Sequence, residues 1–144
     1  MKSFGLVLAF LLLGCATRNP LEEAKAVLKS HEEYVKAGNL DGVINNMADD
    51  IIGMAPGMTL IKGKDEFRAF YSSVFKMGKS EFVHDYHGAD IVGDVVILHG
   101  LARGTLTLHD STTSPLANNF MIALRYQSDG KLKVWRAAFA PSSQ

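Results

Sequence analysis

VVILHGLARGTLTLH, residues 95–109, alternates between two kinds of side chain along its length. Successive residues of a strand point to opposite faces of a sheet. One set of alternate positions is entirely apolar or small and comprises Val96, Leu98, Gly100, Ala102, Gly104, Leu106 and Leu108. The other set includes His99 and Arg103. The pattern predicts a long strand whose apolar face packs under another layer and whose mixed face turns outward.

Further strands and three helices are predicted around this segment. Strand patterns cover residues 81–86, 89–92, 119–127 and 132–140. Apolar residues recur at helical spacing over residues 24–35, 40–47 and 67–75. Glycine and proline interrupt residues 51–61, which predicts a hairpin of two short strands. The order helix, helix, hairpin, helix and then long antiparallel strands predicts an α+β domain with its helices on one face of a curved sheet.

Four short motifs follow one another in the order seen in a known superfamily. They are Ala37-Gly38-Asn39-Leu40-Asp41, Met47-Ala48-Asp49-Asp50, Ile61-Lys62-Gly63-Lys64 and Tyr126-Gln127-Ser128-Asp129-Gly130-Lys131. With them the chain resembles the NTF2-like superfamily, particularly its SnoaL-like and ketosteroid-isomerase-like branches. The resemblance implies a cone in which a curved antiparallel sheet carries three N-terminal helices on its concave face, with a pocket between the layers. It also implies a homodimer formed across the outer sheet face.

The resemblance further allows the isomerase mechanism to be tested by residue type. That mechanism needs a carboxylate base, a tyrosine and a protonated aspartate. The matching positions here hold Ala55, His31 and Ile122. Because all three catalytic residue types are missing, the isomerase mechanism is not expected. The adjacent carboxylates Asp49 and Asp50 are predicted to bond backbone amides at a helix end instead.

His31 and Tyr34 are the candidate catalytic residues. Both share the apolar stripe of the first helix with Leu28, so both are predicted to point inward. His31 could act as a general base or an orienting donor, aided by Tyr34. The alternative is a buried histidine that is satisfied by a neighbour, with Tyr34 serving in packing.

An apolar pocket is predicted between the helices and the sheet. In the family register, alternate residues of the last strand, including Trp135 and Phe139, face inward. The candidate ligand-binding residues are Met54, Met58, Phe70, Ile122, Trp135 and Phe139. The same residues could equally form a filled core. No cofactor is predicted, and no metal site either, since His84 and His87 lie three residues apart and would face opposite sides of a strand.

The N-terminus has the pattern of a bacterial lipoprotein signal. Lys2 precedes an apolar run over residues 4–13, which is too short to span a bilayer. The run ends in Leu12-Leu13-Gly14-Cys15, which resembles the lipobox. We therefore expect residues 1–14 to be a signal peptide, residues 15–20 a tether lipidated at Cys15, and residues 21–141 the folded domain. Because Ala16 follows the cysteine, the expected location is the outer membrane, facing the periplasm.

The charge composition limits the classes of binding partner that are expected. Fifteen basic and fifteen acidic residues cancel, without a run of like charge, so nucleic acid is not an expected partner. Three hypotheses stay open: a domain that binds an apolar small molecule, an enzyme (cyclase, isomerase or dehydratase) in which His31 carries a proton, and an interaction module in the cell envelope. Alternate outer-face residues such as Arg125 and Arg136 would serve the last of these.

Overall fold

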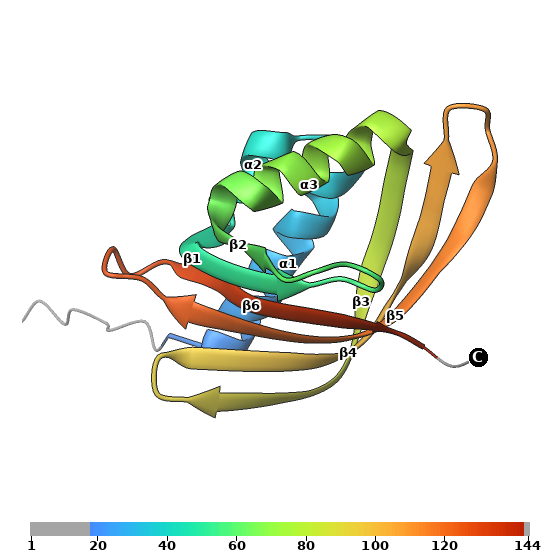
Figure 1. The fold of residues 1–144 in the computed structure, drawn as a ribbon. Helices are drawn as coiled ribbons and strands as arrows, with labels where there is room; N and C mark the ends of the chain where they lie inside the picture. The colour runs from blue at the N-terminus through green and yellow to red at the C-terminus, as the bar shows by residue number, and fades with distance from the viewer. Residues whose placement is uncertain (1–17, 143–144) are drawn as a thin grey trace, which may run out of the picture.

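A six-stranded sheet curves around three helices in the computed structural model, which describes residues 18–142 (Figure 1). The helices are α1 (Pro20–Lys36), α2 (Leu40–Asn45) and α3 (Gly63–Met77). The strands are β1 (Met47–Met54), β2 (Ile61–Lys62), β3 (Gly78–Val92), β4 (Val95–Leu108), β5 (Thr113–Tyr126) and β6 (Leu132–Pro141). All three helices lie on one side of the sheet (Figure 1). The predicted α+β class and element order are confirmed.

The sheet order is β2-β1-β6-β5-β4-β3. Four of its neighbouring pairs are antiparallel, whereas β1 and β6 run parallel. The predicted curved antiparallel sheet is therefore confirmed, with one parallel pair that the sequence analysis did not anticipate. β1 and β6 are far apart in the sequence, and local pattern carries no signal for the direction of such a pairing.

The first two helices begin and end where local chemistry favours it. Asn19 caps α1 by accepting a hydrogen bond from the backbone N–H of Glu22, at 3.3 Å. Gly38, at φ +65°, takes the left-handed conformation that follows the helix. Asn39 then caps α2 by accepting from the N–H of Gly42, at 2.9 Å. These turns fold α2 back against α1 and set the angle of the helical layer.

Two β-bulges change the side-chain alternation. In β6, Val134 lies opposite Leu124 but Arg136 lies opposite Ala123, so Trp135 is the extra residue. In β3, His87 is the extra residue between partners of Gly100 and His99. Beyond each bulge, the alternate residues that face the inner and outer sides of the sheet are exchanged.

The core lies between the helices and the middle strands. Its most completely buried side chains are Leu28, Val43, Ile51, Val96, Leu98 and Leu124. The alternation in residues 95–109 is confirmed, because Val96, Leu98, Gly100 and Ala102 are all buried. The predicted signal peptide, residues 1–14, and Cys15 lie outside the described residues. Within residues 18–142, no helix is long and apolar enough to cross a membrane.

Candidate ligand-binding cavity

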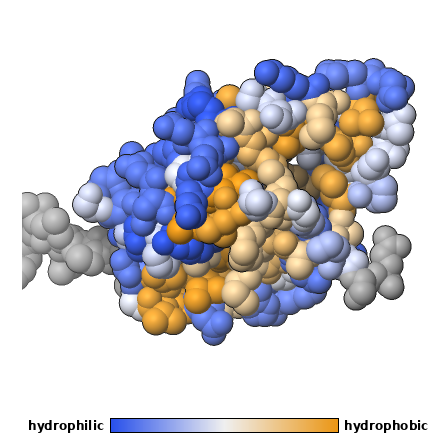
Figure 2. All heavy atoms as spheres, viewed as in Figure 1, coloured by the Kyte–Doolittle hydropathy of each residue, from blue (hydrophilic) through white to orange (hydrophobic). Residues whose placement is uncertain are grey.

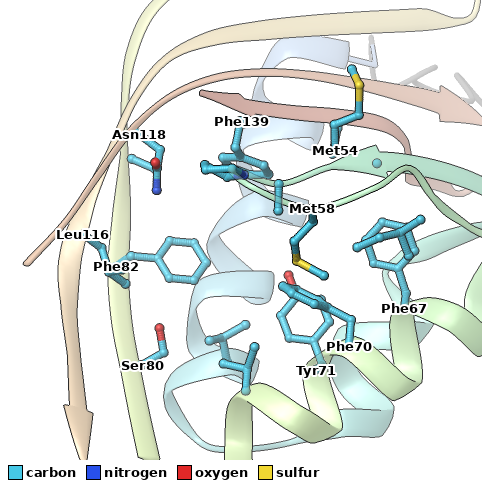
Figure 3. Close-up of a pocket in the computed structure, with 18 of the residues that line it drawn as sticks. Met54, Met58, Phe67, Phe70, Tyr71, Ser80, Phe82, Leu116, Asn118 and Phe139 are labelled. Carbon is cyan, nitrogen blue, oxygen red and sulfur yellow. The ribbon is translucent and has the colours of Figure 1, made fainter. Parts of the chain in front are cut away.

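A cavity of about 350 Å³ opens between α3, the loop after β1 and the concave face of the sheet. Four predicted pocket residues line it: Met54, Met58, Phe70 and Phe139. The prediction missed other large walls, namely Phe67, Tyr71, Phe82 and Leu116. Figure 3 shows the aromatic rings converging on the cavity from α3, β3 and β6. Figure 2 shows hydrophobic residues around a hollow between the helical layer and the long strands.

The cavity wall depends on a close approach between β1 and α3. A Cβ atom at Gly53 would lie 2.5 Å from the ring of Phe67, so only glycine lets that ring lie against β1. At the mouth, Met54 is 50% exposed and Met58 47% exposed. Methionine is flexible and packs against irregular shapes. The opening therefore has an adaptable apolar rim.

A smaller chamber of about 50 Å³ adjoins the inner end of this cavity. Tyr71, Phe82 and Phe139 line both spaces. His31 and the predicted pocket residue Ile122 face only the inner chamber. A space of this size can hold a water molecule or a small polar group of a ligand.

His31 contributes the first polar group of the inner chamber. The side chain is 7% exposed, and its Nε2 lies 2.9 Å from the hydroxyl oxygen of Tyr71. Burial, together with nearby His84, lowers the pKa of His31 to about 4, so the ring is neutral at pH 7. Burial also raises the pKa of Tyr71, which keeps its hydroxyl protonated. The partner of His31 is thus Tyr71 from α3, a long-range contact that periodicity could not reveal.

Glu32 and His84 form a second buried pair, which the sequence analysis missed. Glu32 Oε1 accepts from the backbone N–H of His84 and lies 2.9 Å from His84 Nδ1. Its other oxygen lies 3.3 Å from the ammonium nitrogen of exposed Lys29. Burial lowers the pKa of His84, although the bond to Glu32 opposes this. One signal was present: Glu32 follows Leu28 by four residues and therefore belongs to the same helical stripe.

Two predicted site residues lie elsewhere. Because Trp135 is the bulged residue of β6, its ring turns to the outer face, where it donates to Asp50 at 3.0 Å. Tyr34 lines neither cavity and packs against Gly42 of α2, where an added Cβ would lie 2.6 Å from its ring. The expectation that Trp135 faces the pocket was wrong, and Tyr34 is not the neighbour that assists His31.

The prediction that Asp49 and Asp50 bond backbone amides at a helix end was also wrong. α2 ends at Asn45, and both carboxylates lie exposed in β1. Asp49 pairs with Lys64 at 2.6 Å, and Asp50 pairs with Arg125 at 2.9 Å. Their partners are therefore side chains of other elements rather than the backbone amides of a helix end.

The histidines of β3 are not brought together. The ring of His84 is buried, whereas that of His87 is 55% exposed at the bulge. Across the part of the chain that the structure describes, no group of three or more His, Cys, Asp or Glu side chains could hold a metal ion.

Residues 28–135 match the family model of the SnoaL-like domain. The chain belongs to this family. Among solved structures, the SnoaL-like domain is similar to a ketosteroid isomerase-like protein from Erwinia carotovora atroseptica SCRI1043, with 22% identity and a TM-score of 0.76 over 86% of this chain and 97% of that one. It is also similar to an NTF2-like superfamily protein from Salmonella enterica serovar Typhimurium LT2, with 8% identity and a TM-score of 0.75 over 85% and 91% of the two chains.

A third similar structure is a candidate scytalone dehydratase from Novosphingobium aromaticivorans DSM 12444, with 8% identity and a TM-score of 0.78 over 85% of this chain and 84% of that one. At these identities the likeness concerns the fold, which confirms the predicted NTF2-like cone. The names span different activities, so the SnoaL-like fold does not by itself assign one. No curated protein matches the chain.

Proposed function

We propose that the SnoaL-like domain binds an apolar small molecule in the cavity between α3 and the sheet. The observation that supports this is an open cavity of about 350 Å³ whose walls are almost entirely apolar. Ligand sites are usually concave and apolar with a few polar groups, and they start at about 300 Å³. Solvent-exposed apolar walls are unfavourable in a protein without an occupant.

The wall composition also favours an uncharged ligand. Among the described residues that line this cavity, none is charged, and the polar ones are Tyr71, Ser80 and Asn118. An ion would lose its hydration there without gaining a counter-charge. A neutral molecule with an aromatic or aliphatic body suits the site best.

Titration with the neutral fluorescent probe N-phenyl-1-naphthylamine tests this proposal. We expect saturable binding at one site, and a loss of affinity of at least about tenfold in Val74→Trp, which fills part of the cavity. Val92→Trp is the matched control, because Val92 is 64% exposed and lies outside the cavity lining. Fluorescence that does not saturate, or equal affinity in both variants, would contradict the proposal.

Proton transfer at His31 is a second candidate function. It is favoured by the 2.9 Å contact between His31 Nε2 and Tyr71, since a neutral imidazole beside a protonated phenol can accept or pass on a proton. A cyclase, isomerase or dehydratase would then use His31 with Tyr71. His31→Ala should abolish turnover of a substrate found through the binding experiment and leave the fold intact. Unchanged turnover would remove this candidate.

We also propose that the outer sheet face pairs with a second copy of the chain. Met121 is 58% exposed and Val83 55% exposed on that face, with Ile97 and Leu101 half-buried beside them. Sedimentation velocity should show a dimer that Met121→Asp converts to a monomer, whereas Ile91→Asp, at an exposed position that pairs with Val96 on the inner face, leaves it intact. A protein that is monomeric from the start would contradict this pairing.

The N-terminal pattern supports a proposal of its own, an anchor in the cell envelope through lipid on Cys15. Several acyl chains give stable anchoring, because each buried methylene contributes about 0.8 kcal/mol. Cys15→Ser should move the protein from the membrane fraction to the soluble fraction of cells. A variant that stays with the membrane would exclude the lipid anchor.

A further inference from the structure

Two buried histidine nitrogens, on residues that line the inner chamber, have no hydrogen-bond partner among the described residues. They are Nδ1 of His31 and Nε2 of His84. The two rings are 7% and 8% exposed, and both line the chamber. Buried polar atoms in folded proteins are almost always paired with protein, water or ligand. These two atoms therefore indicate a missing partner at the inner end of the cavity.

In a neutral histidine ring one nitrogen is a donor and the other an acceptor, so the bond made by the first nitrogen determines whether the partner of the second must donate or accept. Glu32 accepts from the backbone N–H of His84 and lies 2.9 Å from Nδ1, so Nδ1 carries the proton of a neutral ring. His84 Nε2 is then an acceptor. The hydroxyl of Tyr71 is hydrogen-bonded to His31 Nε2. When Tyr71 donates in that bond, His31 Nδ1 carries the proton and is a donor.

We infer that the inner chamber is the subsite for a hydroxyl group of an apolar ligand, held between His84 Nε2 and His31 Nδ1. The inference rests on the proposed binding function and assigns the chemical class of its ligand. A hydroxyl can donate to Nε2 and accept from the Nδ1 hydrogen at once. A ketone or ether oxygen can only accept, so it would leave His84 Nε2 unpaired. The ligand class is a neutral apolar alcohol or phenol.

The same chamber discriminates against carboxylates. Glu32 does not line the chamber itself, but it lies 2.9 Å from Nδ1 of His84, which does, and it is 7% exposed, so its charge is only weakly screened by solvent. Lys29 contacts Glu32 from the outside, and it does not line the chamber. An anionic head group would therefore contact two neutral rings, with a like charge behind one of them. A fatty acid or aryl carboxylate is expected to bind more weakly than the matching alcohol.

Three probes with the same two-ring body separate these effects by calorimetric titration. 2-Naphthol has the hydroxyl, 2-methylnaphthalene replaces it with a methyl group of similar size, and 2-naphthoate is ionised at neutral pH. We expect 2-naphthol to bind at least about tenfold more tightly than 2-methylnaphthalene. We expect 2-naphthoate to be the weakest of the three.

Two variants remove one unpaired nitrogen each and keep the structural bond of its ring. His84→Asn retains an amide N–H near the position of Nδ1, beside Glu32, and deletes Nε2. His31→Gln retains a polar group near the position of Nε2, beside Tyr71, and deletes Nδ1. Each should reduce the advantage of 2-naphthol to about threefold or less and leave 2-methylnaphthalene nearly unchanged. Glu32→Gln keeps an oxygen acceptor but removes the charge. It should therefore reduce the ratio of the affinities for 2-naphthol and 2-naphthoate by roughly tenfold.

The outcomes distinguish this inference from the function on which it rests. If 2-methylnaphthalene binds as tightly as 2-naphthol, the apolar cavity stands and the hydroxyl subsite is wrong, with a water molecule as the occupant of the chamber. If no probe binds to the wild-type protein, both proposals fail. Should His84→Asn and His31→Gln not fold, as judged by circular dichroism, the ratio of the two neutral probes on the wild-type protein decides alone.

Discussion

Aromatic rings lie beside polar groups both on the outer face of β5 and β6 and in the inner chamber. The two regions differ in whether those polar groups are hydrogen-bonded to one another. Outside, the guanidinium groups of Arg125 and Arg136 lie 4.5 and 4.0 Å from the ring of Trp135. Asp50 accepts from Arg125 and from the indole N–H of Trp135. Inside, His31 and His84 each have one nitrogen that no group within residues 18–142 pairs with.

This difference separates a structural cluster from a candidate site. The polar groups of the outer cluster pair with one another and are partly solvated, so none of them requires a ligand as a partner. The inner pair is buried, where an unpaired polar atom is costly and water is scarce. Polar groups that are numerous and paired stabilise the sheet, whereas polar groups that are few and unpaired indicate where a ligand binds.

The largest expected contrast between the two regions is in stability. His84→Leu removes the ring N–H that donates to the buried carboxylate of Glu32, and only the backbone N–H of residue 84 and Lys29 remain beside it, so we expect a loss of about 3 kcal/mol in the free energy of unfolding. Arg125→Leu removes an exposed ion pair and should cost about 1 kcal/mol or less. Urea unfolding of both variants measures this. Equal losses would mean that the Glu32–His84 pair contributes no more than a surface contact.

A second contrast appears in the pH dependence of stability. His31 has a pKa of about 4 in the folded protein, against an ordinary value of 6.5 in the unfolded chain. Below pH 6.5 the unfolded state gains a proton that the folded state does not, so stability falls as the pH drops toward 4. The loss attributable to His31 reaches about 3 kcal/mol, since each pKa unit is worth about 1.4 kcal/mol.

The ring of His31 faces Tyr71 from α3 and His84 from β3. The lowered pKa of His84 acts in the same direction. Thermal unfolding between pH 7 and pH 4 should therefore show a steeper decline in the wild-type protein than in His31→Gln. Identical profiles would show that protonation of His31 is not linked to unfolding.

The smallest expected effect concerns Trp135, which distinguishes the two faces by ligand affinity. Trp135→Phe loses one exposed hydrogen bond and should cost about 1 kcal/mol of stability without changing probe affinity. Phe139→Ala removes an aromatic wall and should weaken N-phenyl-1-naphthylamine binding by about tenfold. A probe affinity that falls in Trp135→Phe would place the ligand on the outer face.

Trp135 also shows how far sequence reasoning reaches. The strand over residues 95–109 and the stripe of α1 were predictable because regular alternation and helical spacing are local properties. The bulge at Trp135 was not, since one extra residue reverses the alternation and nothing in the local sequence marks it. Phe139, beyond the bulge, kept its predicted inward direction, whereas Trp135 did not.

The candidate site was predictable in part for the same reason. Met54, Met58, Phe70 and Phe139 could be assigned to a pocket from hydrophobicity and the family register. The pairs His31–Tyr71 and Glu32–His84 join residues 40 and 52 positions apart, so only the folded chain brings them together. Glu32 alone carried a local signal, as a carboxylate on the apolar stripe of α1.

A crystal structure of the complex with 2-naphthol tests the central claim most directly. The account predicts the two rings between Phe70 and Phe139, and the hydroxyl oxygen within hydrogen-bonding distance of His84 Nε2 and His31 Nδ1. A naphthol bound on the outer face beside Met121, or one in the cavity with its hydroxyl turned to the mouth at Met58, would contradict it.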